Sequence, residues 1–371
     1  MSAGIVLAAG GTGGHLFPAQ ALAQALRGRG HRLTLVTDGR GGGYGEMFDG
    51  IDVEVVAAAT LTGRGLPGRV SALFDIARGV GQARRLLKRL RAAVVVGFGG
   101  YPALPTMLAA ISLRLPTLIH EQNAVLGRVN RLLAPLVTAI AASFARTSGI
   151  PPRHRGKVTV TGNPVRAEVK RIGEQDYVPP ETGGAIRLLV FGGSQGASVL
   201  SDVVPAAILG LDDDLAERIA LTQQCRPDDC ERVAMLYRSA GIAAEVASFF
   251  DDLPDRLASA HLVIARAGAG TVSELAVAGR PAILVPYQHA TDDHQTANAE
   301  NLAGVDGAIL LAQQALEPLD LTRRLEGLAR HPERLAALAR NARLAGHADA
   351  GERLADLVEA TAVVRSEGAP G

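Results

Sequence analysis

Residues 5–15 read IVLAAGGTGGH, a short apolar run that passes directly into a cluster of glycines. Residues 188–197, LLVFGGSQGA, repeat this arrangement in the second half of the chain. Each half carries a further glycine cluster after another apolar run, at Gly97–Gly100 and at Gly268 with Gly270. An apolar run followed by a glycine loop is typical of the strand–turn–helix units of doubly wound α/β domains. The sequence therefore predicts two such domains.

The other apolar runs agree with parallel sheets that helices cover on both faces, because they are nearly continuous rather than alternating. Strands are expected at residues 5–8, 32–36, 53–56, 94–96 and 117–119, and at 188–191, 219–222, 262–265 and 283–285. We predict an α/β fold with one Rossmann-like domain at 1–163 and another at 164–345, since Pro164 interrupts regular structure at their boundary. Residues 334–364 are expected to be helical, and the segment 346–371 is expected to pack back on the first domain and end in a tail.

The composition excludes several classes of protein. The 371 residues can form two hydrophobic cores. A formal net charge of +1, few aromatic residues and no tryptophan argue against a nucleic-acid partner. Cys225 and Cys230 are too few for a disulfide framework and are expected to be reduced thiols in a cytosolic protein. Residues 92–113 are uncharged, but glycines and prolines interrupt them, so we expect no membrane span and no secretory signal.

A glycine loop that opens a helix presents backbone N–H groups at the positive end of the helix dipole. Gly10–Gly14 and Gly192–Gly196 fit this description, and together they predict phosphate binding in both halves of the chain. His15 follows the first loop, where a neutral imidazole could act as the general base for a hydroxyl group.

Two polar segments of the second half are candidates for donor binding. Residues 271–274, TVSE, predict a capping box with Thr271 as the N-cap, and the carboxylate of Glu274 could also accept hydrogen bonds from ribose hydroxyls. Loops beyond the carboxyl ends of parallel strands commonly bind ligands. The loop after residues 283–285 gathers His289, Asp292, His294, Gln295 and Asn298.

A serine hydrolase is the main rival interpretation. Gly192–Gly196 spells the G-x-S-x-G nucleophile elbow around Ser194, and Asp251 or Asp255 and then His289 or His294 follow in the required order. This reading leaves the first half of the chain unexplained. No metal site is expected, because His120–Asn123 lacks the second histidine of a zinc-protease helix.

The segment 71–91 predicts an amphipathic helix. Its core face would carry Leu73, Ile76, Val80, Ala83, Leu87 and Leu90, whereas its other faces carry six basic residues against the single Asp75. A basic face beside Leu66 and Phe74 could lie against anionic lipid.

Taken together, these motifs resemble the MurG family of bacterial peripheral-membrane glycosyltransferases. Members add N-acetylglucosamine to undecaprenyl-pyrophosphoryl-muramoyl-pentapeptide (lipid I) and so form lipid II for peptidoglycan. The matching segments, in the family's order, are residues 10–15 (GGTGGH), 97–101 (GFGGY), 120–123 (HEQN), 162–166 (GNPVR), 192–197 (GGSQGA), 271–274 (TVSE) and 288–289 with Gln295.

The resemblance implies a GT-B fold, with the active site in a cleft between the two domains. It also implies no cofactor and three partners: UDP-N-acetylglucosamine (UDP-GlcNAc), lipid I and an anionic membrane surface at the cytoplasmic face of the cell membrane. His15 matches the proposed general base. The implied donor-binding residues are Thr12, Gly13, Gly14, Asn123, Arg166, Ser194, Phe250, Ala269, Gly270, Thr271, Val272, Ser273, Glu274 and Gln295. Gly11, Gly99, Gly100 and Tyr101 are implied to face the acceptor's pyrophosphate.

One departure concerns the acceptor. Ala103 stands where many members carry a small polar residue, so the resemblance supports only backbone contacts there. Two alternatives share the predicted fold: a UDP-GlcNAc 2-epimerase, which needs no lipid acceptor, and a non-catalytic protein that binds nucleotide sugars.

Overall fold

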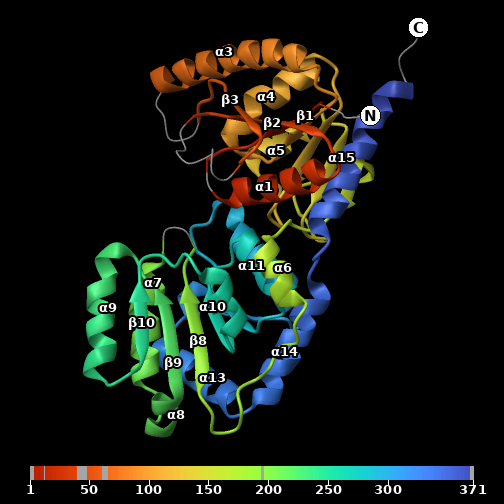
Figure 1. Ribbon diagram of the computed structural model, residues 1–371. Coiled ribbons are helices and arrows are strands. Elements are labelled where there is room, and N and C mark those ends of the chain that lie inside the picture. Colours follow the sequence, from red (N-terminus) through yellow and green to blue (C-terminus); the bar gives the residue numbers. More distant parts are fainter. Residues whose placement is uncertain (1–3, 12, 40–47, 61–65, 194–195, 368–371) are drawn as a thin grey trace. The chain divides into compact units, whose positions relative to one another are not determined.

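The computed structural model describes residues 4–11, 13–39, 48–60, 66–193 and 196–367 (Figure 1). The internal contacts of the chain divide it into two compact units, Met1–Val165 with Asp349–Gly371, and Arg166–Ala348. Each unit is built on one parallel sheet, which confirms the predicted α/β architecture.

The first unit contains a seven-stranded sheet in the order β3-β2-β1-β4-β5-β6-β7. Its strands are β1 (Gly4–Ala8), β2 (Arg32–Thr37), β3 (Asp52–Val55), β4 (Val94–Gly97), β5 (Thr117–Glu121), β6 (Ala139–Ala142) and β7 (Val158–Val160). Its helices are α1 (Gly13–Gly28), α3 (Leu66–Leu90), α4 (Gly100–Ser112), α5 (Arg128–Leu133), the 3₁₀ helix η1 (Pro152–Lys157) and α15 (Ala350–Glu367).

Alternate residues of β1 enter two different hydrophobic clusters. Ile5 and Leu7 pack with α1 and with Leu354 and Val358 of α15, whereas Val6 packs on the opposite face with α3 and α4. Figure 1 shows α1 and α15 on one side of this sheet and α3 with α4 on the other. Burial on both faces explains why these strands read as continuous apolar runs.

The second unit contains a six-stranded sheet in the order β10-β9-β8-β11-β12-β13. Its strands are β8 (Ile186–Phe191), β9 (Ile219–Gln224), β10 (Ala244–Ala247), β11 (Leu262–Ala265), β12 (Ala282–Leu284) and β13 (Ile309–Leu310). Its helices are α6 (Ala167–Gly173), α7 (Ser198–Leu209), α8 (Asp213–Arg218), α9 (Pro227–Ser239), α10 (Leu253–Ser259), α11 (Ala269–Ala278), α12 (His294–Ala303), α13 (Pro318–Ala329) and α14 (Pro332–Ala345), with 3₁₀ helices η2 (Thr291–Asp293) and η3 (Gln313–Ala315).

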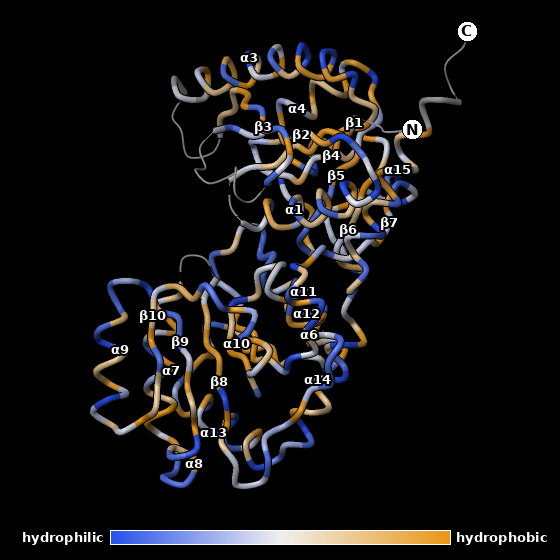
Figure 2. The backbone as a smooth tube through the Cα atoms, in the orientation of Figure 1, coloured by the Kyte–Doolittle hydropathy of each residue, from blue (hydrophilic) through white to orange (hydrophobic). Residues whose placement is uncertain are grey.

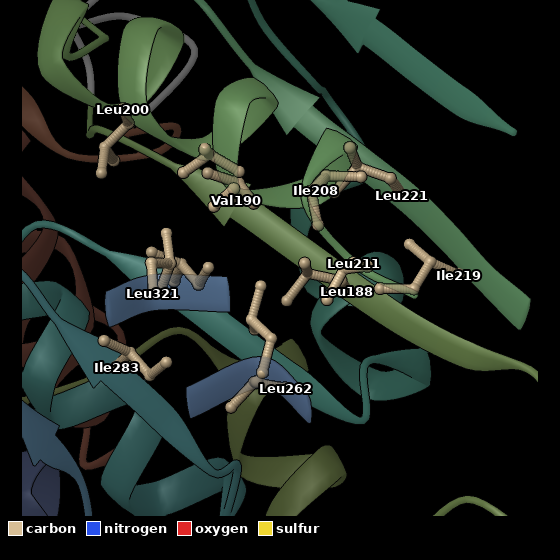
Figure 3. Close-up of a cluster of buried hydrophobic side chains, with 14 of the residues drawn as sticks. Leu188, Val190, Leu200, Ile208, Leu211, Ile219, Leu221, Leu262, Ile283 and Leu321 are labelled. Carbon is tan, nitrogen blue, oxygen red and sulfur yellow. The ribbon is translucent and has the colours of Figure 1, made fainter. Parts of the chain in front are cut away.

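A large apolar core lies on one face of this second sheet. Figure 3 shows Leu188 and Val190 of β8 in one cluster with Leu200 and Ile208 of α7 and with Leu321 of α13. Leu200, Ile208 and Leu321 have no exposed surface. This packing fixes β8 and α7, and therefore the two ends of the glycine loop that joins them.

Two expectations about helices were wrong. The predicted helix 334–364 is interrupted, because α14 ends at Ala345 and α15 begins at Ala350 after a segment that starts with Gly346. Leu73 was expected in the core but is 57% exposed, since α3 turns this residue to the same side as the exposed Val70 and Phe74.

Candidate functional site

The glycine loops of the first unit lie at the point where the strand order reverses. β1 and β4 are neighbours, and the chain winds outward in opposite directions from them. The loops that leave their carboxyl ends lead to α1 at Gly13 and to α4 at Gly100. Such a reversal point is where doubly wound sheets bind ligands. Gly11, Gly13 and Gly14 lie here; Thr12 lies outside the described residues.

The loop after β4 requires glycine. Gly99 and Gly100 have φ angles of 84° and 70°, a region that side chains with a Cβ rarely adopt. A Cβ atom on Gly100 would lie 3.4 Å from Nε2 of His15. The predicted base and the predicted acceptor loop are therefore adjacent. Tyr101 follows in the first turn of α4, and Ala103 is completely buried.

His15 is tied to a buried polar chain at the carboxyl end of β5. Its Nδ1 lies 3.2 Å from Oε1 of Gln122, whose side-chain Nε2 lies 3.0 Å from the carbonyl oxygen of Phe98 and 3.1 Å from Nδ1 of His120. Gln122 is 2% exposed and His120 is fully buried. Burial lowers the pKa of His120 to about 4, so its imidazole is neutral at pH 7.

The adjacent Glu121 organises the next loop. Its Oε1 accepts hydrogen bonds from the backbone N–H and side-chain amide of Asn123, at 3.0 and 3.3 Å. Its Oε2 accepts from the backbone of Gly127 and the amide of Asn130, at 2.8 and 2.9 Å. Four donors satisfy this buried carboxylate, which holds Asn123 at the carboxyl edge of the sheet. The sequence analysis named residues 120–123 only as a segment that matches the family and gave His120, Glu121 and Gln122 no role; their position at the carboxyl end of a buried strand was the available signal.

The second unit repeats the reversal point, between β8 and β11. The loop after β8 holds Gly192–Gly196, of which Ser194 and Gln195 lie outside the described residues. The loop after β11 leads into α11, whose N-cap is Gly268. The predicted capping box is therefore wrong. α11 begins at Ala269, two residues before Thr271, which lies inside the first turn with Gly270, Val272 and Ser273 following the helix path.

Glu274 makes a different interaction from the predicted cap. Its two carboxylate oxygens accept from Nε and Nη2 of Arg166, at 2.8 and 2.9 Å. Both side chains are largely buried, with exposed fractions of 18% for Glu274 and 28% for Arg166. A two-point arginine–carboxylate pair is geometrically specific as well as strong. Two predicted donor-binding residues are thus brought together and bind each other.

Gln295 joins the loops that follow β11 and β12. Its Oε1 accepts from the backbone N–H groups of Ala267 and Tyr287, at 3.2 and 2.9 Å. Nearby, Arg266 is 8% exposed and donates to the carbonyl oxygens of Val285 and Pro286. Burial lowers the pKa of this guanidinium. Arg266 was missed because nothing in its local sequence distinguishes a buried arginine from a surface one.

Phe250 lies before α10 and is 8% exposed, with the guanidinium of Arg256 4.1 Å from its ring centre. Its ring is therefore engaged in packing, which leaves its backbone for ligand contacts.

The hydrolase arrangement is not assembled. His289 contacts Gln288 and the ring of Tyr287, and Nδ1 of His294 lies 2.7 Å from the carbonyl oxygen of Thr291. Among the described residues neither histidine pairs with a carboxylate, which a Ser-His-Asp triad requires. The same part of the chain contains no group of three or more metal-ligating side chains.

Comparison with known proteins places both units in one family. Residues 5–142 match the glycosyltransferase family 28 N-terminal domain, and residues 187–354 match the corresponding C-terminal domain. The UDP-N-acetylglucosamine--N-acetylmuramyl-(pentapeptide) pyrophosphoryl-undecaprenol N-acetylglucosamine transferase of Rhodospirillum rubrum is 53% identical over 96% of this chain and 92% of its own length.

Solved structures agree. The crystal structure of Acinetobacter baumannii MurG matches with a TM-score of 0.78 and 30% identity, over 96% of this chain and 99% of that one. A UDP-GlcNAc 2-epimerase from Neisseria meningitidis shares only the fold, with a TM-score of 0.67 and 15% identity over 97% of this chain and 100% of that one. Two parallel sheets with this topology form the GT-B fold, and the relationship over nearly the whole chain shows that this protein belongs to the MurG family of family 28 glycosyltransferases.

Proposed function

We propose that this chain transfers N-acetylglucosamine from UDP-GlcNAc to lipid I and so forms lipid II. The observation that carries this proposal is the 53% identity, over nearly both full lengths, with a transferase named for these substrates. The geometry agrees, because both sheets end in glycine loops at their strand-order reversal points. The 2-epimerase shares the fold at low identity, and within the described part of the chain neither His289 nor His294 pairs with a carboxylate.

The second unit would hold the donor. In this assignment Glu274 accepts hydrogen bonds from the ribose hydroxyls, and the Gly192–Gly196 loop with Ser194 holds the diphosphate. The first turn of α11 and the backbone near Phe250 would contact the sugar and the uracil. Because Arg166 already occupies both oxygens of Glu274, the ribose must share this carboxylate or displace the arginine.

The first unit would hold the acceptor and the base. His15 accepts the proton of the muramoyl 4-hydroxyl at Nε2 while the hydroxyl oxygen forms a bond to the anomeric carbon of the donor. The bond from that carbon to the diphosphate oxygen breaks, UDP leaves with the electron pair, and the configuration inverts to a β-1,4 linkage. The loops at Gly11 and at Gly99–Tyr101 would face the lipid-linked pyrophosphate. Backbone N–H groups at the helix N-termini would offset the negative charge that develops on UDP.

A transfer assay with UDP-GlcNAc and a lipid I analogue tests this function. We expect lipid II formation only when both substrates are present, and His15→Ala should lower the rate by roughly 10²–10⁴-fold, as expected for loss of a general base. His331→Ala, an exposed histidine of the second unit, is the matched control. Full turnover by His15→Ala would contradict the base assignment. UDP-sugar turnover without any lipid acceptor would instead favour an epimerase.

The lipid substrate raises the question of membrane contact. No helix among the described residues is both long and apolar enough to cross a bilayer. We propose peripheral binding at the cytoplasmic face of the membrane through α3. At 100° per residue, the exposed side chains of Val70, Leu73 and Phe74 and those of Arg78 and Arg85 fall on one face of this helix. Apolar and hydrophilic residues are interspersed along α3 in Figure 2.

Three bulky apolar side chains of α3 are exposed to solvent, which is unusual for a helix on a protein surface. Val70, Leu73 and Phe74 are 68%, 57% and 70% exposed. We expect binding to vesicles with anionic lipid that weakens as salt increases, and a substantial loss of binding in Phe74→Ser. Leu344→Ser, which removes a leucine that is 85% exposed in the second unit, is the control. Equal binding by both variants would contradict a role for α3.

A further inference from the structure

The hydrogen-bonded chain behind His15 determines which ring nitrogen carries the proton in His15 and in His120. The starting point is the side-chain amide of Gln122, whose nitrogen and oxygen must be told apart by their partners. Nε2 of Gln122 lies 3.0 Å from the carbonyl oxygen of Phe98 and 3.3 Å from that of His120. Carbonyl oxygens only accept, so the nitrogen must face them and Oε1 must face His15.

This orientation decides which nitrogen of His15 carries the proton. Oε1 of Gln122 can only accept, and it lies 3.2 Å from Nδ1 of His15. Nδ1 must therefore be the protonated nitrogen, and in the neutral ring Nε2 is left with a free lone pair. Nε2 is also the nitrogen that faces Gly100, where a Cβ atom would approach to 3.4 Å. The unprotonated Nε2 of His15 thus lies beside the loop proposed to face the acceptor.

The far end of the chain agrees with the same assignment. Nε2 of Gln122 also lies 3.1 Å from Nδ1 of His120, and because an amide nitrogen cannot accept a hydrogen bond, this Nδ1 is unprotonated. The proton of His120 is then on Nε2, which lies 3.4 Å from the carbonyl oxygen of Gly162 and from Oγ of Ser143. Burial lowers the pKa of His120 to about 4, so it remains neutral and cannot donate from both nitrogens at working pH.

We infer that Gln122 is a positioning residue for the transfer reaction, which sets the tautomer and ring orientation of His15 by accepting from its Nδ1–H. The role corresponds to that of the carboxylate in a hydrolase triad. Here a neutral amide oxygen accepts the hydrogen bond from the imidazole, so no charge is added beside the base. It rests on the proposed function of His15 as the base. It adds that the base is prepared before substrate binds, by a side chain that does not contact substrate.

Nitrogen-15 NMR of the histidine side chains tests the assignment directly, without depending on transferase activity. In the wild-type chain labelled at histidine, the signals absent from His15→Ala identify His15, and we expect Nδ1 protonated and Nε2 bare. Gln122→Met keeps a side chain of similar length but removes the acceptor. It should shift His15 towards the Nε2–H form, which free imidazole prefers, and lower kcat by about tenfold, the equivalent of one lost hydrogen bond, with the KM for UDP-GlcNAc changed by less than about twofold.

Thr117→Val is the matched control, because it removes a buried hydroxyl from the other end of β5. It should leave both the tautomer of His15 and kcat unchanged. A wild-type His15 protonated at Nε2 overturns the inference even if Gln122→Met cannot be folded, and so does a Gln122→Met chain with wild-type kcat and tautomer. Failure of the wild-type chain to transfer sugar would contradict the proposed function instead, so the two can fail separately.

Discussion

His261 makes the stability of the second unit depend on pH. The residue is 4% exposed, its Nδ1 accepts from the backbone N–H of Arg187, and its Nε2 lies beside the guanidinium of the same arginine. Burial, with the nearby charges of Arg187 and Arg280, lowers its pKa to about 4. The folded chain therefore keeps this imidazole neutral under conditions in which an unfolded chain would protonate it.

The sign and size of the effect follow from this difference. The ordinary pKa is 6.5, so between pH 6.5 and 4 the unfolded state binds more protons than the folded state, and stability falls as the pH falls. Stability from this group is complete above pH 6.5. This pKa difference lowers the free energy of unfolding by about 2 kcal/mol between pH 7.5 and pH 5.

Urea denaturation followed by far-UV circular dichroism at the two pH values measures the loss. His261→Asn is the informative variant, because its Oδ1 can replace Nδ1 as the acceptor for Arg187 but does not titrate. We expect the variant to lose about 2 kcal/mol less than the wild-type chain over this interval. Parallel pH dependence in the two chains would refute the reasoning, because it would mean that His261 is either protonated or accessible to water in the folded state.

Three further predictions concern other contacts. Arg29→Met should lower the free energy of unfolding of the first unit by about 1–2 kcal/mol, because Arg29 pairs with three carboxylates of α15. Hydrogen exchange at low salt should show faster opening of that helix, and unchanged exchange would contradict this role. Gly100→Ala should destabilise the first unit by about 1 kcal/mol and lower transfer, since its φ is 70° and a Cβ would crowd His15; wild-type turnover would argue against the acceptor loop. Glu274→Gln should remove the carboxylate that pairs with Arg166 and raise the KM for UDP-GlcNAc by roughly tenfold, measured by initial rates, whereas an unchanged KM would exclude ribose binding by this side chain.

The sequence predicted most of the strands, including the four-residue β4 and β11 and the three-residue β12, but missed β6, β7, β10 and β13. β1, β2 and β8 were recognisable because five or six residues, buried on both faces, leave an unmistakable apolar run. β13 has two residues and β7 has three partly exposed or exposed ones, so their local sequences resemble loops. Their places in the sheets depend on pairing with neighbouring strands, which no local pattern records.

The candidate site shows the same limit. The glycine loops and His15 were found because their chemistry is local, a bare backbone at the start of a helix. The capping box failed because Gly268 lets α11 begin before Thr271. The pair between Arg166 and Glu274 joins residues that are far apart in the chain, and only the fold brings them together.

The return of α15 to the first unit has a consequence for how the chain is made. Leu354, Ala355 and Val358 complete the cluster beneath α1, but they are synthesised after the whole of Arg166–Ala348. The first unit can therefore complete its core only after the whole of the second unit has been synthesised. Until α15 is synthesised, the apolar side chains on the inner face of α1 stay partly exposed to solvent, among them Leu16, Leu22 and Leu26. Exposed apolar surface of this kind is what a chaperone would recognise.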